Sequence, residues 1–206
     1  MAKLYFKYGV MGSSKSANAL MTRFNYLEKG CEVLMIKPAI DTRDYEVDEN
    51  GIKHAIVHSR IGLSAPVDVV DENDSIIELL KSRNVNCKIS AIVVDEAQFM
   101  SSEQIQELKY IAEMLDIAVI CYGLLTDFQT KLFPGSKRLI ELANETEHMR
   151  HVCSCGRGAQ VNARMDEVGN VIVEGAQVAI GGNELYEAMC WKCWKAKSNT
   201  PVDVEF

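Results

Sequence analysis

Residues 9–16 read GVMGSSKS, a glycine- and serine-rich loop that follows an apolar segment with the sequence KLYFKYG. The loop nearly matches the phosphate-binding pattern G-x-x-x-x-G-K-[ST]. Gly9, Lys15 and Ser16 fit the pattern, whereas Ser14 occupies the position of the second glycine. Serine is small enough for phosphate to approach the backbone, but a positive φ angle strains it slightly. The pattern therefore predicts a strand, a phosphate loop and a helix in immediate succession.

The segments after the loop continue this alternation of strand and helix. Apolar residues recur at helical spacing over residues 16–29, which predicts a helix that Gly30 ends. Residues 31–38 have the pattern of the next strand, and the acidic residues 41–51 are expected to form an exposed loop. The expected apolar face of the first helix comprises Ala17, Leu20, Met21, Phe24 and Leu27.

Two more helices and two more strands are expected further along. Residues 74–83 form one predicted helix, and a second begins with a capping-box pattern from Ser101 to Gln104. Strands are expected at 89–96 and 117–123, and strands that alternate with helices pair in parallel. The sequence thus predicts an α/β fold, a P-loop (RecA-like) parallel sheet flanked by helices, with the loop at the sheet edge where ligands bind. The expected apolar face of the second of these helices comprises Ile105, Leu108, Ile111 and Leu115.

After about residue 146 the pattern changes to short segments, glycines and cysteines. We therefore expect a nucleotide-binding domain over residues 1–145 and a small zinc-binding domain over residues 146–206. Four of the seven cysteines lie in the second part, as C-S-C at 153–155 and C-W-K-C at 190–193. Four thiolates suit a closed, structural zinc site. The alternatives are free thiols, a thioredoxin-like pair, or His148 or His151 in place of a cysteine ligand. A zinc ion bound by both pairs would tether the two ends of the segment between them.

The charge balance excludes some classes of partner. The chain has 206 residues and a formal net charge of -7, which argues against a broad surface for nucleic acid or anionic membrane. Its apolar runs are far shorter than a membrane span. The N-terminal residues MAKLYFKYG have no signal-peptide layout. We therefore expect a cytoplasmic protein with neither a nucleic acid nor a membrane as partner.

A second motif supports a nucleotide site. The segment AIVVDEAQF is an apolar run that ends in Asp95, as in the second magnesium-binding strand of phosphate-loop enzymes. Lys15 would reach the terminal phosphates, while Ser16 and Asp95 would hold magnesium. Glu96 would lie at the strand tip, where it can accept a proton from water or from a substrate hydroxyl. A chance loop and a solvated acidic turn are the alternatives, but the two motifs together predict a magnesium-dependent nucleoside triphosphate site.

The ordered set of motifs resembles the type II thymidine kinases, a cytosolic family with a P-loop domain and a zinc-bound lasso. The likeness covers nearly the whole chain and rests on GVMGSSKS, HSRIGL, VVDEAQF, YGLLTDF, the C-x-C, IGGNELY and the final C-x-x-C. The resemblance implies transfer of the γ-phosphate of ATP to the 5′-hydroxyl of thymidine, and also of deoxyuridine, in nucleotide salvage. It further implies magnesium, a structural zinc ion, a homotetramer and feedback inhibition by thymidine triphosphate (dTTP).

The resemblance also assigns roles around the triphosphate. It implies that Glu96 is the catalytic base for the 5′-hydroxyl. It implies that Arg60 of the HSR motif, together with Lys15, stabilises charge near the transferred phosphoryl group. The implied ATP-binding residues are Gly9, Val10, Met11, Gly12, Ser13, Ser14, Lys15, Ser16, Asp95, Glu96, Ala97 and Gln98.

The remaining implied roles concern the nucleoside and the zinc ion. Phe128 would stack on the thymine ring, and Tyr186 would close the site; without the family, they would be interpreted as a core aromatic and a surface residue. The backbone of the lasso would bind the base. The implied substrate-binding residues are Met11, Phe128, Gln177, Val178, Ala179, Ile180, Gly181 and Tyr186. The implied zinc ligands are Cys153, Cys155, Cys190 and Cys193.

Two rival functions remain at this point. The letters DEAQ also resemble the acidic box of helicases, which would indicate an ATPase stimulated by nucleic acid. That class needs two motor domains and a basic track, and the length and charge of this chain argue against it. A zinc-ribbon adaptor with a decayed nucleotide fold is the other alternative. The retention of Lys15, Ser16, Asp95 and Glu96 argues against decay.

Overall fold

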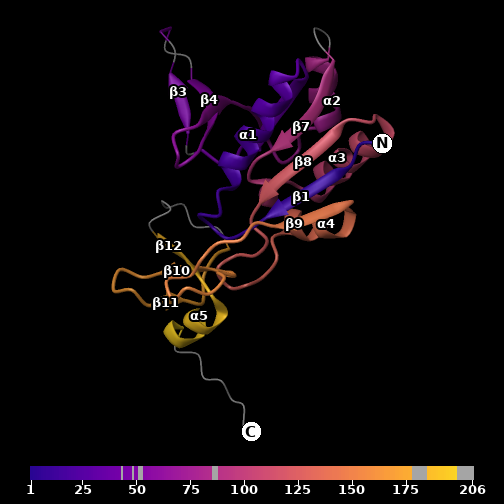
Figure 1. The fold of residues 1–206 in the computed structure, drawn as a ribbon. Helices are drawn as coiled ribbons and strands as arrows, with labels where there is room; N and C mark the ends of the chain where they lie inside the picture. Colours follow the sequence, from indigo (N-terminus) through magenta and orange to yellow (C-terminus); the bar gives the residue numbers. More distant parts are fainter. Residues whose placement is uncertain (43, 48, 51–52, 85–87, 178–184, 199–206) are drawn as a thin grey trace.

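The computed structural model describes residues 1–42, 44–47, 49–50, 53–84, 88–177 and 185–198. Within these residues, six strands pair in parallel in the order β6-β2-β7-β8-β1-β9, which confirms the predicted α/β class (Figure 1). The apolar runs that predicted strands form the inner strands. The strands are β1 (Leu4–Tyr8), β2 (Glu32–Pro38), β6 (Asp68–Val70), β7 (Ile89–Val94), β8 (Ala118–Gly123) and β9 (Glu145–His148).

Helices cover both faces of this sheet. Alternate residues of β7 point to opposite sides, so that Ile92 and Val94 join one apolar cluster with α2, α3 and α4, while Ala91 and Val93 join another with α1. The capping box predicted at Ser101 is present at the start of α3. The helices are α1 (Lys15–Glu28), α2 (Ile76–Arg83), α3 (Ser102–Met114), α4 (Pro134–Leu142) and the short 3₁₀ helix η1 (Ala97–Phe99).

Three residues predicted to lie on the apolar faces of helices are exposed, and these predictions are wrong. Met21 and Phe24 on α1 are 51% and 62% exposed, and Leu115, the residue that caps α3, is 44% exposed. On α1, the Thr22 hydroxyl and the Tyr122 hydroxyl lie 2.7 Å apart in a hydrogen bond, which directs a polar residue of the helix toward the sheet. The helix is therefore turned so that Met21 and Phe24 face outward.

The acidic segment expected to form a loop contains a strand. Residues 45–47 form β3 (Tyr45–Val47), which pairs antiparallel with β4 (Lys53–His58), and β4 pairs in turn with β5 (Ser64–Pro66). Tyr and Val favour extended backbone, and the partner strand supplies the hydrogen bonds that a loop would lack. This hairpin projects beside α1, away from the C-terminal part of the chain (Figure 1).

The C-terminal part forms a small module beyond the sheet edge to which the parallel strands point (Figure 1). It comprises a second sheet in the order β11-β10-β12 and a short helix. The predicted boundary between residues 145 and 146 falls at the start of β9, and the division into two domains stays a prediction. The elements of the module are β10 (Val161–Met165), β11 (Val171–Ile172), β12 (Tyr186–Met189) and α5 (Trp191–Lys197).

Candidate active site

The loop between β1 and α1 lies at the carboxyl edge of the parallel sheet. Gly9 is required there by close approach, because a Cβ atom at this position would lie 2.5 Å from the carbonyl oxygen of Met149 and 2.5 Å from the Ser13 hydroxyl. Lys15 is buried and folds back over the loop, where its Nζ donates to the carbonyl oxygen of Val10 at 2.8 Å. The loop thus has the strand, turn and helix that the sequence pattern predicts.

Ser14, the residue in place of the second glycine, has φ 60° and ψ 28°. This is the left-handed region, in which an L-residue with a side chain costs about 1–2 kcal/mol. The predicted strain at Ser14 is therefore present, and it lies immediately before the first residue of α1.

Asp95 and Ser16, the predicted magnesium ligands, lie next to each other, with Ser16 at the end of the phosphate loop. Asp95 is 4% exposed at the end of β7, and its carboxylate accepts a hydrogen bond from the Ser16 side chain. Burial, followed by the charge of Glu96, raises the pKa of Asp95 to about 7, against the opposing effects of the Ser16 hydrogen bond and of Lys15. A buried carboxylate and a hydroxyl in contact at a phosphate loop form a suitable pair of donors for Mg²⁺.

Glu96 has an unusual backbone for a glutamate. Its φ of 52° and ψ of 37° place it in the left-handed region, and strain of this kind is concentrated at functional sites. The amide of Gln98 donates to Glu96 Oε2 at 2.5 Å, while the Gln98 side-chain oxygen accepts from the backbone N–H of Leu124 at 2.9 Å. Gln98, predicted to bind nucleotide, thus orients Glu96 and connects it to the loop after β8.

Arg60 lies beside the phosphate loop although it comes from the segment that follows β4. A Cβ atom built on Gly12 would lie 3.7 Å from Arg60 Nη1 and 3.2 Å from His151 Nε2. The structure therefore brings the predicted Arg60 to the loop. It also brings His151, which the sequence suggested only as a replacement zinc ligand or a surface residue.

The predicted nucleoside residues meet between the sheet and the module. Phe128 is 1% exposed, and the guanidinium of Arg164 covers one face of its ring at 3.8 Å. Tyr186, at the start of β12, is half-buried, and Gln177 donates from Nε2 to Asp127 Oδ2 at 3.0 Å. Four predicted lasso residues lie outside the described residues: Val178, Ala179, Ile180 and Gly181.

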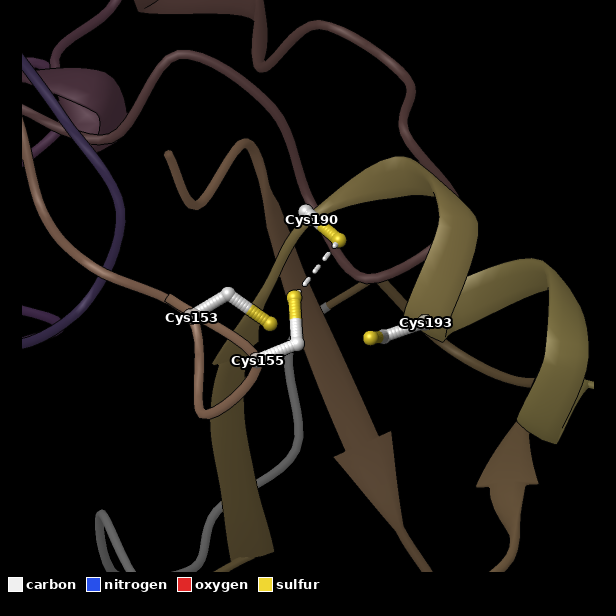
Figure 2. A group of neighbouring side chains, drawn as sticks. All are labelled: Cys153, Cys155, Cys190 and Cys193. Carbon is white, nitrogen blue, oxygen red and sulfur yellow. Dashed lines mark hydrogen bonds between the residues drawn. The ribbon is translucent and has the colours of Figure 1, made fainter. Parts of the chain in front are cut away.

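Four cysteines converge in the module, two from a tight loop and two from the start of α5 (Figure 2). Their Sγ atoms all lie within 4.8 Å of one another. The Sγ atoms of Cys155 and Cys190 are 3.6 Å apart, too far for a disulfide, and all four cysteines are free thiols. The group that could hold a metal ion in the described chain contains these four cysteines and neither His148 nor His151.

The thiols interact strongly with one another. Backbone N–H groups, first that of Cys155 and then that of Cys190, lower the pKa of Cys153 to about 6. Hydrogen bonds with the other three thiols raise the pKa of Cys193 to about 12. Such a group concentrates negative charge that a divalent cation can neutralise, and four thiolates are the donor set that tetrahedral zinc prefers.

The C-terminal module contacts the phosphate loop directly. Val10 packs into the module's apolar cluster, and the Met11 backbone N–H donates to Asn162 Oδ1 at 2.7 Å. Asn162 Nδ2 in turn donates to the carbonyl oxygen of Thr126. Met11, a residue of the phosphate loop, is therefore connected through Asn162 to the segment that carries Phe128, and its double role stays a prediction.

A family model described as thymidine kinase matches residues 2–194. The chain belongs to the thymidine kinase family. It is 41% identical to a thymidine kinase of Shewanella oneidensis over 93% of this chain and 96% of the relative. It is 40% identical to that of Ruegeria pomeroyi over 98% of both chains, and 41% identical to that of Zymomonas mobilis over 97% of this chain and all of the relative.

Membership of the thymidine kinase family confirms the resemblance found in the motifs and implies the use of ATP. The helicase-like interpretation of DEAQ gains no support, because the match extends through the phosphate loop and the cysteine pairs alike. In the described part of the chain, no helix combines the length and the apolar character needed to cross a membrane.

Three buried polar residues of the candidate site were not predicted from the sequence. They are Asp127, Asn162 and Arg164, each less than one tenth exposed. Buried polar side chains are hydrogen-bonded to specific partners, and those partners are distant in the chain. The one available signal was the polar character of Asn162 and Arg164 within the otherwise apolar-alternating segment 161–165.

Replacement of Ser14 by glycine is expected to raise the melting temperature by ~2 °C, because it removes about 1 kcal/mol of backbone strain. Because glycine is the usual residue at this position of the phosphate loop, we expect that the KM for ATP does not rise. Differential scanning calorimetry measures the first effect, and steady-state kinetics the second. Ser82→Gly on α2, where the backbone is helical, is the matched control and should lower the melting temperature. A lower melting temperature for Ser14→Gly would contradict the strain argument.

Proposed function

We propose that the protein is a cytoplasmic, ATP-dependent thymidine kinase that transfers the γ-phosphoryl group of ATP to the 5′-hydroxyl of thymidine, and also of deoxyuridine. The product is thymidine monophosphate, formed in nucleotide salvage. The observation that carries the proposal is the placement of Ser16, Asp95 and Glu96 around one phosphate loop. Full-length similarity to proteins named thymidine kinase supports the choice of substrate.

The proposed transfer divides the chemistry among four side chains. Glu96 accepts the proton of the 5′-hydroxyl, and Gln98 keeps its carboxylate in one orientation through the 2.5 Å hydrogen bond. Lys15 leaves the Val10 carbonyl to contact the terminal phosphates, whose backbone partners are the N–H groups of the loop. Arg60, whose Nη1 would lie 3.7 Å from a Cβ atom on Gly12, balances the charge on the transferred group.

Two metal ions complete the proposed site. Ser16 and Asp95 would hold Mg²⁺, which would supply positive charge next to the phosphates. Cys153, Cys155 and the pair from α5 hold zinc, whose role is structural because four protein ligands leave no open position. The proposal also keeps the division into a nucleotide-binding domain and a zinc-binding domain, in which the lasso would bind the nucleoside.

Phosphoryl transfer from γ-labelled ATP with magnesium tests the proposal. The protein is incubated with a panel of nucleosides and with a control that lacks nucleoside. Thymidine monophosphate is the expected main product, with deoxyuridine as the next substrate. ATP hydrolysis without a phosphorylated nucleoside would support an ATPase instead, and ATP binding without turnover would support the adaptor alternative.

Removal of zinc is expected to change tryptophan fluorescence and to lower stability. Both tryptophans of the chain lie on α5, where Trp191 and Trp194 flank Cys193 and contact each other with ring centroids 4.9 Å apart and planes tilted by 35°. Chelation should alter their emission and lower the free energy of unfolding by about 5 kcal/mol or more. Mass spectrometry should find one zinc ion per chain. Cys193→Ser should reproduce the effect, whereas Cys31→Ser, outside the cluster, should not. Unchanged emission in a metal-free protein would contradict the zinc site.

The proposed assembly is a homotetramer, and dTTP is the proposed feedback inhibitor. The exposed Met21 and Phe24 on α1 support burial of this helix face against a second copy of the chain. Phe24→Lys is expected to weaken association by ~30-fold, as for an aromatic at an interface centre. Sedimentation velocity over a concentration series measures this. Leu115→Lys, which introduces the same charge on another face, is the control. A tetramer that persists equally in both variants would exclude the α1 face.

A further inference from the structure

Arg164 on β10 connects two residues that are ten positions apart in the chain. Its Nη2 donates to the carbonyl oxygen of Ala176 at 3.1 Å and to the Tyr186 hydroxyl at 2.8 Å, and its Nε donates to the same hydroxyl at 3.0 Å. Ala176 and Tyr186 are the residues on either side of the segment 177–185, which contains the lasso motif. One side chain therefore holds the start and the end of this segment together.

The same guanidinium also packs against the aromatic residue of the proposed nucleoside site. Its Cζ atom lies 3.8 Å from the ring centroid of Phe128 and 5.4 Å from that of Tyr186. Arg164 and Phe128 are both almost fully buried. A guanidinium that stacks on one ring and donates within its plane has its orientation fixed by both contacts. The guanidinium therefore covers one face of the Phe128 ring.

A second attachment lies next to the first. Gln177 Nε2 donates to Asp127 Oδ2 at 3.0 Å, and Asp127 Oδ1 accepts from the backbone N–H groups of Gln129 and Lys131. Asp127 is buried and precedes Phe128 in the chain. Ala176 is thus attached to β10, and Gln177 to the turn that carries Phe128.

We propose that Arg164 is a positioning residue for nucleoside binding. It sets the separation of Phe128 and Tyr186 and holds the backbone of Ala176 next to Tyr186. This inference rests on the proposed function, since it takes Phe128 and Tyr186 as residues of the nucleoside site. Without the guanidinium, these groups must be ordered when the nucleoside binds, which weakens binding without changing the triphosphate loop.

Steady-state kinetics with Arg164→Lys and Arg164→Ala test the proposal. Lysine keeps the charge but not the planar fork, and we expect it to raise the KM for thymidine by ~10-fold, with a larger increase for alanine. The KM for ATP is expected to stay within about twofold, because the loop contacts are unaffected. The matched control is Arg138→Ala on α4, which removes an arginine paired with Glu141 and should change neither KM.

A double-mutant cycle with Tyr186→Phe identifies the partner. If Tyr186 acts through Arg164, the double variant Arg164→Lys/Tyr186→Phe should have the same KM for thymidine as Arg164→Lys alone. Multiplied effects in the double variant would overturn the link between the two residues. An unchanged KM for thymidine in Arg164→Ala, or an equal rise in the KM for both substrates, would overturn the positioning role.

Hydrogen exchange separates failure of this inference from failure of the proposed function. If the wild-type protein makes no thymidine monophosphate, the proposed function fails. The contacts of Arg164 with Ala176 and Tyr186 are then tested without nucleoside. Amide exchange in the peptide that contains Ala176 and Tyr186 should be faster in Arg164→Lys than in the wild type, with α3 unchanged. Equal exchange in Arg164→Lys and the wild type would overturn the positioning role of Arg164. If Arg164→Ala does not fold, Arg164→Lys and Tyr186→Phe carry both measurements.

Discussion

Glu96→Gln is expected to lower kcat for thymidine phosphorylation by ~10²- to 10⁴-fold, the contribution of a positioned general base. Glutamine has the same shape and the same left-handed backbone strain as Glu96, but it cannot accept the proton of the 5′-hydroxyl. The KM for ATP should change little, since Glu96 acts on the other substrate. Initial rates at saturating ATP and thymidine measure the effect.

Glu103→Gln provides the control for this substitution. Glu103 is exposed in the first turn of α3, and its replacement should leave kcat within about twofold. Wild-type rates for Glu96→Gln would remove Glu96 from the mechanism. In that case, the strained backbone at this position would need another explanation, such as the approach of η1 to β8.

Asp95→Asn is expected to abolish activity and, at the same time, to stabilise the protein at pH 8. The pKa of Asp95 is raised to about 7 by burial, so the unfolded chain releases this proton at a lower pH than the folded chain does. Stability therefore falls as pH rises from about 4 to about 7, by on the order of 4 kcal/mol. Asparagine carries no charge to desolvate and removes this loss. Loss of a magnesium ligand should lower kcat by ~10²-fold or more.

Thermal unfolding without magnesium, at pH 5 and at pH 8, tests the sign of this effect. The variant should melt ~5 °C or more above the wild type at pH 8, with a much smaller difference at pH 5, where Asp95 is protonated in the folded protein. Asp166→Asn is the matched control: hydrogen bonds with Asn170 lower the pKa of this carboxylate, so the substitution should not stabilise at pH 8. A constant difference between the two pH values would exclude Asp95 as the cause.

The parts of the fold that local patterns control were predicted correctly. The strand, loop and helix around Lys15, the buried strand before Asp95 and the capping box at Ser101 each depend on residues close together in the sequence. The four cysteines were predicted to act as one group because their residue types restrict the chemistry. In each case, the residues themselves contain the necessary constraint.

Other elements lack the apolar periodicity that predicts structure. Helix α4 buries Gly135 and Ser136, and a Cβ atom on Gly135 would lie 2.7 Å from the carbonyl oxygen of Met100, so the contact requires a small residue. Strand β9 has the sequence ETEH and is exposed throughout, as an edge strand can be. Neither pattern could be recognised without the partner element.

The site residues that were missed are defined by distant partners. Arg164 is fixed by Phe128, Ala176 and Tyr186, and Asn162 by the backbone of Met11. A polar residue in a strand can face either solvent or a buried partner, and the pattern of the strand alone does not distinguish these cases. Only the tertiary arrangement reveals which polar side chains are buried.

The place of β1 in the sheet has a consequence for the order of folding. This strand precedes the other strands of the sheet in the sequence, yet its neighbours are β8 and β9, with Leu4 paired to Val119 and Tyr5 to Glu145. Such long-range pairing delays completion of the sheet until most of the chain has been synthesised. The phosphate loop follows β1 and contacts the module after β9, and it is therefore assembled last. A nascent chain therefore gains its triphosphate site only after the residues of β8 and β9 have been synthesised.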